Sequence, residues 1–257
     1  MLATGQTIIA KALRERGGKP VARFDIVANR YDAFCATPLG SFVEAVEHQI
    51  VSAVLDPRPG ERVVDLGCGT GTSTLWLADA GCMVVGVDES QAMLVIARNK
   101  KTSAGRMEWV HGDLTQLPWA SASFDAGLIQ VALEFVDQPA VVLTEALRVI
   151  KPGGRLVLGL IQGTGPWAHH YRMRAQADPT SVYHGAHFWT LPELARLMAM
   201  NPSQVRGGLF VGPTEFRTGE QAWAWESRYR AVRPLADAGF LAVRYERPML
   251  LQQPNRP

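Results

Sequence analysis

Short apolar runs alternate with helical patterns through the middle of this 257-residue chain. Runs rich in Val, Ile and Leu predict buried strands at 62–66, 83–87, 107–110, 126–129 and 155–161. Helical spacing covers 72–80, 91–100 and 139–149, and the last pattern is followed by the helix-stopping run Lys-Pro-Gly-Gly. This alternation is typical of a parallel sheet that is covered by helices.

The two flanks of this core extend the pattern. An apolar stripe at helical spacing runs through 24–55, and we expect this segment to cap the carboxyl edge of the sheet. After the core, helices are predicted at 166–176, at 191–200 and from about Glu220, and strands at 205–211 and 240–246. The fold class is therefore α/β, with a doubly wound, seven-stranded, mostly parallel sheet, helices on both faces and an antiparallel last strand.

Composition narrows the class of protein. The chain is 47% hydrophobic and 19% charged, and it has no apolar run of the roughly 20 residues that a membrane span needs. A net charge of +2, without a basic tract, gives no reason to expect a nucleic-acid partner. Cys35, Cys68 and Cys82 fit neither a disulfide framework nor a zinc pattern, so we expect a reducing cytoplasm and no metal site. Residues 1–18 predict a short covering helix or a tail.

The stretch VVDLGCGTG at 63–71 places three glycines at the end of the first predicted strand. In a doubly wound sheet, ligands bind at this loop, where glycine lets them approach the backbone. A tight strand-to-helix turn would explain the glycines equally well. Asp88, however, ends the second strand about 20 residues later, which is the position of a carboxylate that binds ribose hydroxyls. The pair of features indicates a nucleoside ligand.

Asp65 distinguishes between kinds of nucleoside. A pyrophosphate at this loop would be repelled by the carboxylate, by on the order of 4 kcal/mol at about 4 Å near a protein surface. In addition, Thr72 stands where the last glycine of a dinucleotide loop should be. An NAD-dependent oxidoreductase is thus the less favoured alternative. A cationic nucleoside, of which S-adenosylmethionine (SAM) is the common one, fits both acids.

Four segments taken together, VVDLGCGTG, VDES, GDLTQLPWASASFDAGL and EALRVIKPGGRLVL, resemble the class I SAM-dependent methyltransferases. The resemblance is closest to the group that includes quinone-biosynthesis methyltransferases, and it covers about 24–161 well. It implies a Rossmann-like fold, SAM as cofactor and transfer of its methyl group to a small-molecule acceptor by in-line displacement. A SAM-binding protein without catalysis stays an alternative. A homodimer is compatible with the sequence.

The resemblance also implies a set of cofactor contacts. Asp113 and Leu114 would bind the adenine, Gln130 and Val131 would approach the methionine part, and Tyr31 would cover its carboxylate end. The full expected set is Tyr31, Asp65, Gly67, Cys68, Gly69, Thr70, Gly71, Asp88, Glu89, Ser90, Met93, Gly112, Asp113, Leu114, Gln130 and Val131.

The acceptor site is expected from the helical cap at 1–55 and from 162–200 within the core at 56–257. A general base is needed only if the accepting atom is still protonated. The candidates for such a catalytic group are His169, His170 and Tyr31, with solvated or core histidines as the alternative. Relatives often place histidine at Phe135, so this chain departs from them, and the phenyl ring favours an aromatic or aliphatic acceptor.

Overall fold

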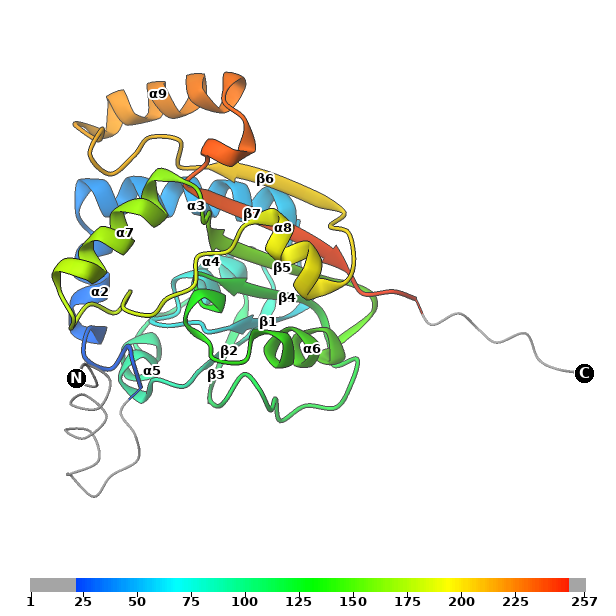
Figure 1. Ribbon diagram of the computed structural model, residues 1–257. Helices are drawn as coiled ribbons and strands as arrows, with labels where there is room; N and C mark the ends of the chain where they lie inside the picture. Colours follow the sequence, from blue (N-terminus) through cyan, green and yellow to red (C-terminus); the bar gives the residue numbers. More distant parts are fainter. Residues whose placement is uncertain (1–21, 250–257) are drawn as a thin grey trace, which may run out of the picture.

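The computed structural model describes residues 22–249, and the predicted helix within 1–18 lies outside these described residues (Figure 1). The strands are β1 (Arg62–Leu66), β2 (Met83–Asp88), β3 (Arg106–His111), β4 (Phe124–Gln130), β5 (Ile150–Ile161), β6 (Gln204–Gly208) and β7 (Phe240–Glu246). The helices are α2 (Ala28–Cys35), α3 (Pro38–Leu55), α4 (Thr72–Asp79), α5 (Gln91–Ala97), α6 (Pro139–Val149), α7 (Pro166–Ala177), α8 (Leu191–Met198) and α9 (Gly219–Val232), with 3-10 turns η1 (Leu133–Phe135) and η2 (Leu235–Asp237).

The seven strands form one sheet in the order β3-β2-β1-β4-β5-β7-β6. Strands β1 to β5 pair in parallel, and β7 is antiparallel to both of its neighbours, β5 and β6. The predicted fold class is therefore confirmed, including the antiparallel last strand. Because the parallel strands end at one edge, the loops after β1, β2 and β4 meet there.

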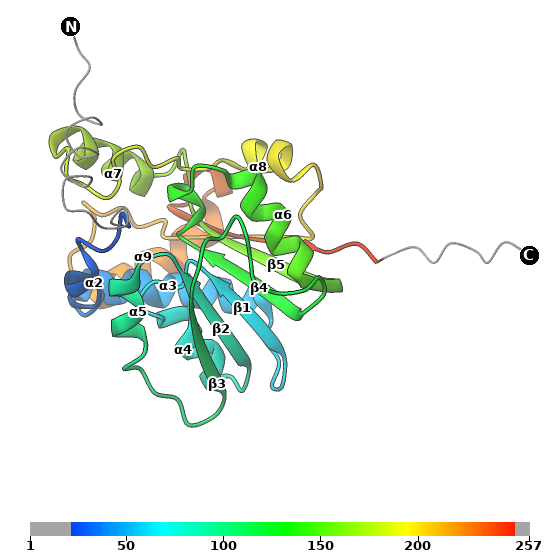
Figure 2. The same ribbon diagram turned by 90° about the horizontal axis from the view of Figure 1, so that it is seen from below.

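Helices cover both faces of the sheet, and β1 shows why. Its side chains alternate between the faces, so Val63 packs with α3 and α4, whereas Val64 packs with α6 and α8. Figure 2 shows α3 and α4 on one side of the strands and α6 and α8 on the other. Both β1 valines are completely buried, which accounts for the continuous apolar run in the sequence.

The segment expected to be one helical cap at the sheet edge is two helices with different positions. Thr37 starts α3, and its hydroxyl oxygen accepts the Gly40 N–H at 3.0 Å, just after α2 has ended. The apolar stripe of α3 packs on β5, β6 and β7 and so covers one face of the sheet, whereas Glu44 and Glu47 of the same helix reach the carboxyl edge.

Strand β5 also differs from its prediction, since it begins at Ile150 and not at residue 155. The run Lys-Pro-Gly-Gly does end α6, but it then continues as strand. Gly153 adopts a φ of +76°, and a Cβ on Gly154 would lie 2.6 Å from the Asp125 carbonyl oxygen. The glycines thus permit an irregular strand start, where the β4–β5 register shifts.

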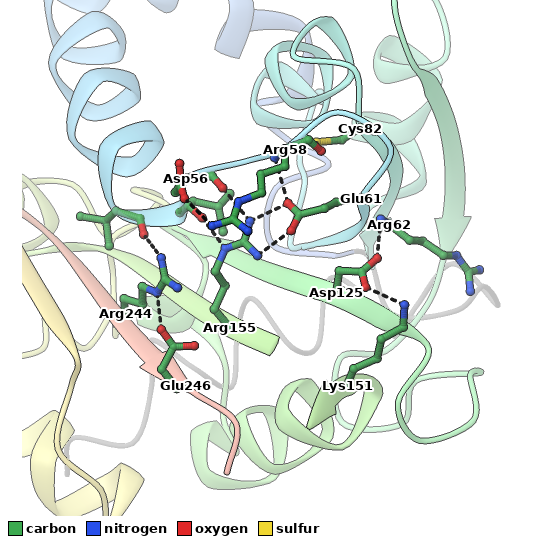
Figure 3. Close-up of polar contacts among 12 residues, drawn as sticks. Asp56, Arg58, Glu61, Arg62, Cys82, Asp125, Lys151, Arg155, Arg244 and Glu246 are labelled. Atoms are coloured by element: carbon green, nitrogen blue, oxygen red, sulfur yellow. Dashed lines mark hydrogen bonds and ion pairs between the residues drawn. The ribbon is translucent and has the colours of Figure 1, made fainter. Parts of the chain in front are cut away.

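Arg155 connects β5 to the end of α3 and to Glu61, the residue before β1 (Figure 3). Its guanidinium donates to both Glu61 carboxylate oxygens, at 2.9 and 2.6 Å, and to the backbone carbonyls of Leu55 and Asp56. The Arg155 side chain is only 8% exposed. Although burial raises the pKa of Glu61, the bonds from Arg155 and from the Arg58 N–H hold it below its usual value. The network therefore joins the end of α3 to β5.

We expect Arg155→Ala to lower the free energy of unfolding by about 3–5 kcal/mol, because it leaves a carboxylate and two carbonyls without their donor. The matched control is Lys151→Ala, since Lys151 pairs with Asp125 at the surface with 47% and 31% of the two side chains exposed. This second change should cost less than about 1 kcal/mol. Urea unfolding measures both, and equal losses would contradict the role given to Arg155.

Candidate functional site

A cavity of about 710 Å³ lies where the loops after β1, β2 and β4 meet. The cavity is lined by residues 67–70, 88–89 and 130–132, which lie at or just after the ends of these strands, while α2 and α3 contribute side chains from the other side. Its volume suits a small-molecule ligand. The cavity is at the sheet edge that the glycine loop predicted.

The glycine loop has the conformation and the openness that a bound ligand requires. Gly67 and Gly69 have φ values of +76° and +54°, which side chains disfavour. A Cβ on Gly69 would meet no atom within 4 Å, so the backbone here is open to the cavity that it lines. The Gly69 N–H donates to the Asp88 Oδ2 at 2.8 Å. Asp88 and the glycine loop are therefore directly connected.

Asp65 lies beneath this loop and is only 1% exposed. Burial raises the pKa of its carboxyl to about 7, the Thr74 hydroxyl that donates to it at 2.6 Å lowers the pKa, and Asp88 raises it. Such a group ionises readily when a cation arrives, because the cation offsets the cost of burying its charge.

The electrostatics of the cavity favour a cationic ligand. Among the described residues that line it, Arg23 is the one Lys or Arg side chain. Eight carboxyl groups line the same space: Glu44, Glu47, Asp65, Asp79, Asp88, Glu89, Asp113 and Asp137. A pyrophosphate would meet repulsion from most of them, whereas the sulfonium and ammonium groups of SAM would be attracted. The residues therefore fit SAM.

Most of the predicted cofactor residues come together at this cavity. Those that line it are Tyr31, Asp65, Gly67, Cys68, Gly69, Thr70, Asp88, Glu89, Met93, Asp113, Leu114, Gln130 and Val131. Asp113 also accepts from the Thr115 N–H and hydroxyl, at 2.8 and 2.7 Å, so it forms a turn as well. Tyr31 is 40% exposed at the rim of the same cavity.

Gly71, Ser90 and Gly112 are placed behind the cavity and not on its wall. Gly71 caps α4, and a Cβ there would collide with Trp109 at 2.2 Å. Ser90 caps α5, and the Gly112 N–H donates to the Asp88 carbonyl at 3.1 Å. These residues support the site without lining it.

The two predicted catalytic histidines also lie off this wall. His169 and His170 belong to α7, whose buried side chains are Trp167, Ala168 and Tyr171. His169 is exposed and His170 is half-buried, and neither lines the cavity. A catalytic role for them stays a prediction that this geometry does not favour.

Sequence reasoning missed the wall that α3 contributes. Glu44, Glu47 and His48 line the cavity from consecutive turns of this helix. Their spacing of three and four residues puts them on one face, beside the apolar stripe. That polar face, next to a predicted ligand loop, is the signal that could have identified them.

Polar contacts connect Asp25, before α2, and Asp32, within α2, to residues around the glycine loop. Thr70 donates its hydroxyl to Asp32 at 2.6 Å, and Lys100 pairs with the same carboxylate at 3.4 Å. Ser90 donates its hydroxyl to Asp25 at 2.5 Å. The N-terminal segment therefore closes the cavity over the loop.

Comparison with known proteins agrees with this site. Residues 64–158 match a family model described as a methyltransferase domain. The chain is 40% identical over 146 residues to the demethylmenaquinone methyltransferase of Clavibacter sepedonicus, covering 57% of this chain and 59% of that enzyme. It is 32% identical over 234 residues to that of Renibacterium salmoninarum, covering 91% and 89%. A SAM-dependent methyltransferase structure from Thermotoga maritima, described as a possible histamine N-methyltransferase, has a TM-score of 0.68 at 25% identity and covers 88% and 98%.

The fold and the acidic nucleoside site thus define a SAM-dependent methyltransferase. The chain belongs to the class I SAM-dependent methyltransferases of the quinone-biosynthesis type. Its cofactor is SAM, and it transfers a methyl group to a small-molecule acceptor, so the oxidoreductase alternative is discarded. Within residues 22–249, no helix is both long enough and apolar enough to cross a membrane.

We expect the affinity for SAM to rise by roughly tenfold between about pH 5.5 and pH 8, which corresponds to a one-unit fall in the Asp65 pKa on binding. The sign follows from the raised pKa: at low pH the carboxyl is neutral, and above about pH 7 it is ionised and attracts the cation. Calorimetric titration at each pH measures this gain, and Asp65→Asn should remove most of it.

Thr74→Val is the matched second variant, because it removes only the hydroxyl that lowers the pKa of Asp65. It should move the gain in SAM affinity to higher pH. A pH dependence that is the same in the wild type and in both variants would contradict the role of Asp65.

Proposed function

We propose that the acceptor is a hydroxylated aromatic ring of the quinol class. The observation that carries this proposal is the aromatic wall around Phe135. The Phe24 ring packs edge-on against it with centroids 4.8 Å apart, and Tyr183 lies at 5.9 Å. Phe24, Phe135 and Trp76 line the same cavity as the glycine loop. Flat aromatic walls favour flat aromatic ligands.

The names of the relatives support the same class. Both bacterial relatives with 40% and 32% identity are demethylmenaquinone methyltransferases, so a quinone-type ring is the acceptor they suggest for this chain. Phe135 stands where relatives often place histidine, which leaves this part of the wall apolar. Arg23, whose guanidinium lies 5.7 Å from the Phe135 ring centre, adds a positive group at its rim.

The individual cofactor contacts are part of the proposal. Asp88 would accept the ribose hydroxyls, Asp113 the adenine amino group, and Gln130 and Val131 would border the methionine part. Their places around one cavity support these roles. Orientation of the acceptor beside the methyl group is then the protein's main catalytic contribution.

We also propose that the enzyme works in the cytoplasm and forms a homodimer. A reducing compartment is supported by Cys35, Cys68 and Cys82, none of which is in a disulfide. The dimer is supported by apolar side chains exposed beside each other in the chain, Val232 at 74% and Leu235 at 39%.

The test is methylation of 1,4-naphthohydroquinone, kept reduced under anaerobic conditions, with SAM as donor. Mass spectrometry should detect one added methyl group and S-adenosylhomocysteine. Phe135→Ala should raise KM for this acceptor about tenfold, because the variant removes an aromatic contact, while the affinity for SAM stays unchanged. Phe135→Leu, which keeps apolar volume, should have a smaller effect. No methylation of this ring, or an unchanged KM in Phe135→Ala, would contradict the proposed acceptor class.

A further inference from the structure

Glu47 lies on the cavity wall and is hydrogen-bonded to Gln130. It projects from α3, is half-buried and lines the cavity wall. The Gln130 amide nitrogen donates to its Oε2 at 3.0 Å, and the Ser73 hydroxyl donates to the Gln130 amide oxygen at 3.0 Å. This chain of bonds fixes the orientation of Gln130, which is the last residue of β4. It thereby fixes one oxygen of the Glu47 carboxyl group.

The other oxygen has room for a ligand. Within the described residues 22–249, Gln130 is the one group that hydrogen-bonds the Glu47 side chain. Because Oε2 faces Gln130, Oε1 is the oxygen that a ligand in the cavity can reach. A carboxylate accepts hydrogen bonds only, so it selects a ligand with an O–H or N–H donor.

The surroundings of Glu47 tune its basicity. Burial raises its pKa to about 8, the bond from Gln130 lowers it and Glu44 raises it. The titratable groups that face it come from α2, α3, η1, α7 and the loop after α7: Tyr31, Cys35, Glu44, Glu134, Tyr171 and Tyr183. All of them are acids, and a cationic ligand in the same cavity would favour the ionised form. A base with a pKa near the working pH is the effective kind.

We propose that Glu47 is a catalytic residue that takes the proton of the acceptor's hydroxyl group. This inference rests on the proposed function, since it requires a hydroxylated acceptor. SAM, when bound, supplies the methyl carbon, and its sulfur keeps the electron pair of the broken bond. The electron pair released on the acceptor, at the oxygen or at the adjoining ring carbon, forms the new bond to that carbon. For ring methylation the displaced ring proton returns to the oxygen, and in both cases Glu47 passes one proton to solvent.

A residue on the same helix but off the cavity provides the control. Gln49 is exposed, does not line the cavity, and its amide oxygen accepts from Arg230 at 2.9 Å. Gln49→Ala therefore changes α3 without disturbing the Ser73–Gln130–Glu47 bonds.

Binding without turnover gives the first test. With S-adenosylhomocysteine bound, at pH 8.5 and so above the Glu47 pKa of about 8, calorimetry should show that the wild type binds 1-naphthol about tenfold more tightly than naphthalene, the preference expected for one hydrogen bond to a charged group. Glu47→Gln should lose this preference, because Gln130 would hold the new amide oxygen and leave its NH2 group facing the ligand. Gln49→Ala should keep it. An unchanged preference in Glu47→Gln would overturn the proposal.

Kinetics with 1,4-naphthohydroquinone gives the second test. In the wild type, kcat/KM should rise with pH to a plateau with an apparent pKa at or below about 8. Glu47→Gln should lower kcat by about 10²–10⁴-fold and abolish the rise, with SAM affinity and melting temperature near wild type. If SAM binding falls as much as turnover, Glu47 holds the donor and the proposal is wrong. If the wild type does not methylate this ring, the proposed function fails, and the naphthol comparison still decides the role of Glu47.

Discussion

The site depends on the two hydrogen bonds that the Asp88 carboxylate accepts from the backbone. Its oxygens accept the Gly69 N–H and the Ser90 N–H, each at 2.8 Å. One side chain therefore joins the loop after β1 to the start of α5, and its remaining lone pairs are directed toward the cavity that Asp88 lines. Ser90 in turn bonds Asp25, so the same anchor extends to the N-terminal segment. The Asp88 carboxylate thus connects the loop and the helix directly, and Ser90 continues the connection to the covering segment.

The cavity therefore contains many carboxyl groups close together, and this affects their ionisation. Burial raises the pKa of Asp65 to about 7 and that of Glu47 to about 8, so in the ligand-free protein part of this charge is held back by bound protons. A cation entering the cavity stabilises the ionised forms. Donor binding would therefore also ionise the group proposed to act on the acceptor, and an acceptor that bound first would meet a weaker base.

The sequence predicts the core well because its signals are local. The bounds of β1, β7 and α6 agree with the predicted ranges, since each is a short apolar pattern between clear breaks. The acceptor side is harder, because it depends on how elements rotate when they pack. On α7, Trp167 and Tyr171 turn inward together, which leaves His169 exposed. On α3, the sequence shows Glu47 only as part of the polar side of an amphipathic helix. Its contact with Gln130 appears only when the helix packs on the sheet.

In the proposed function, Gln130 would fix the position of the donor relative to the acceptor. Its amide receives a bond from α4 and gives one to α3, and these two helices belong to different parts of the chain. The following residue, Val131, has a φ of 49°, an unfavourable conformation for a β-branched side chain. Its N–H donates to the Gly159 carbonyl at 2.7 Å, so β5 holds the turn in place. Such strain persists only where the surrounding structure enforces it. Here it turns the chain sharply after β4, so that Gln130, Val131 and Ala132 all line the cavity. Methyl transfer tolerates little error in the relative position of the two reacting atoms. The Gln130 amide, held between the glycine loop and the proposed acceptor wall, would supply the required constraint.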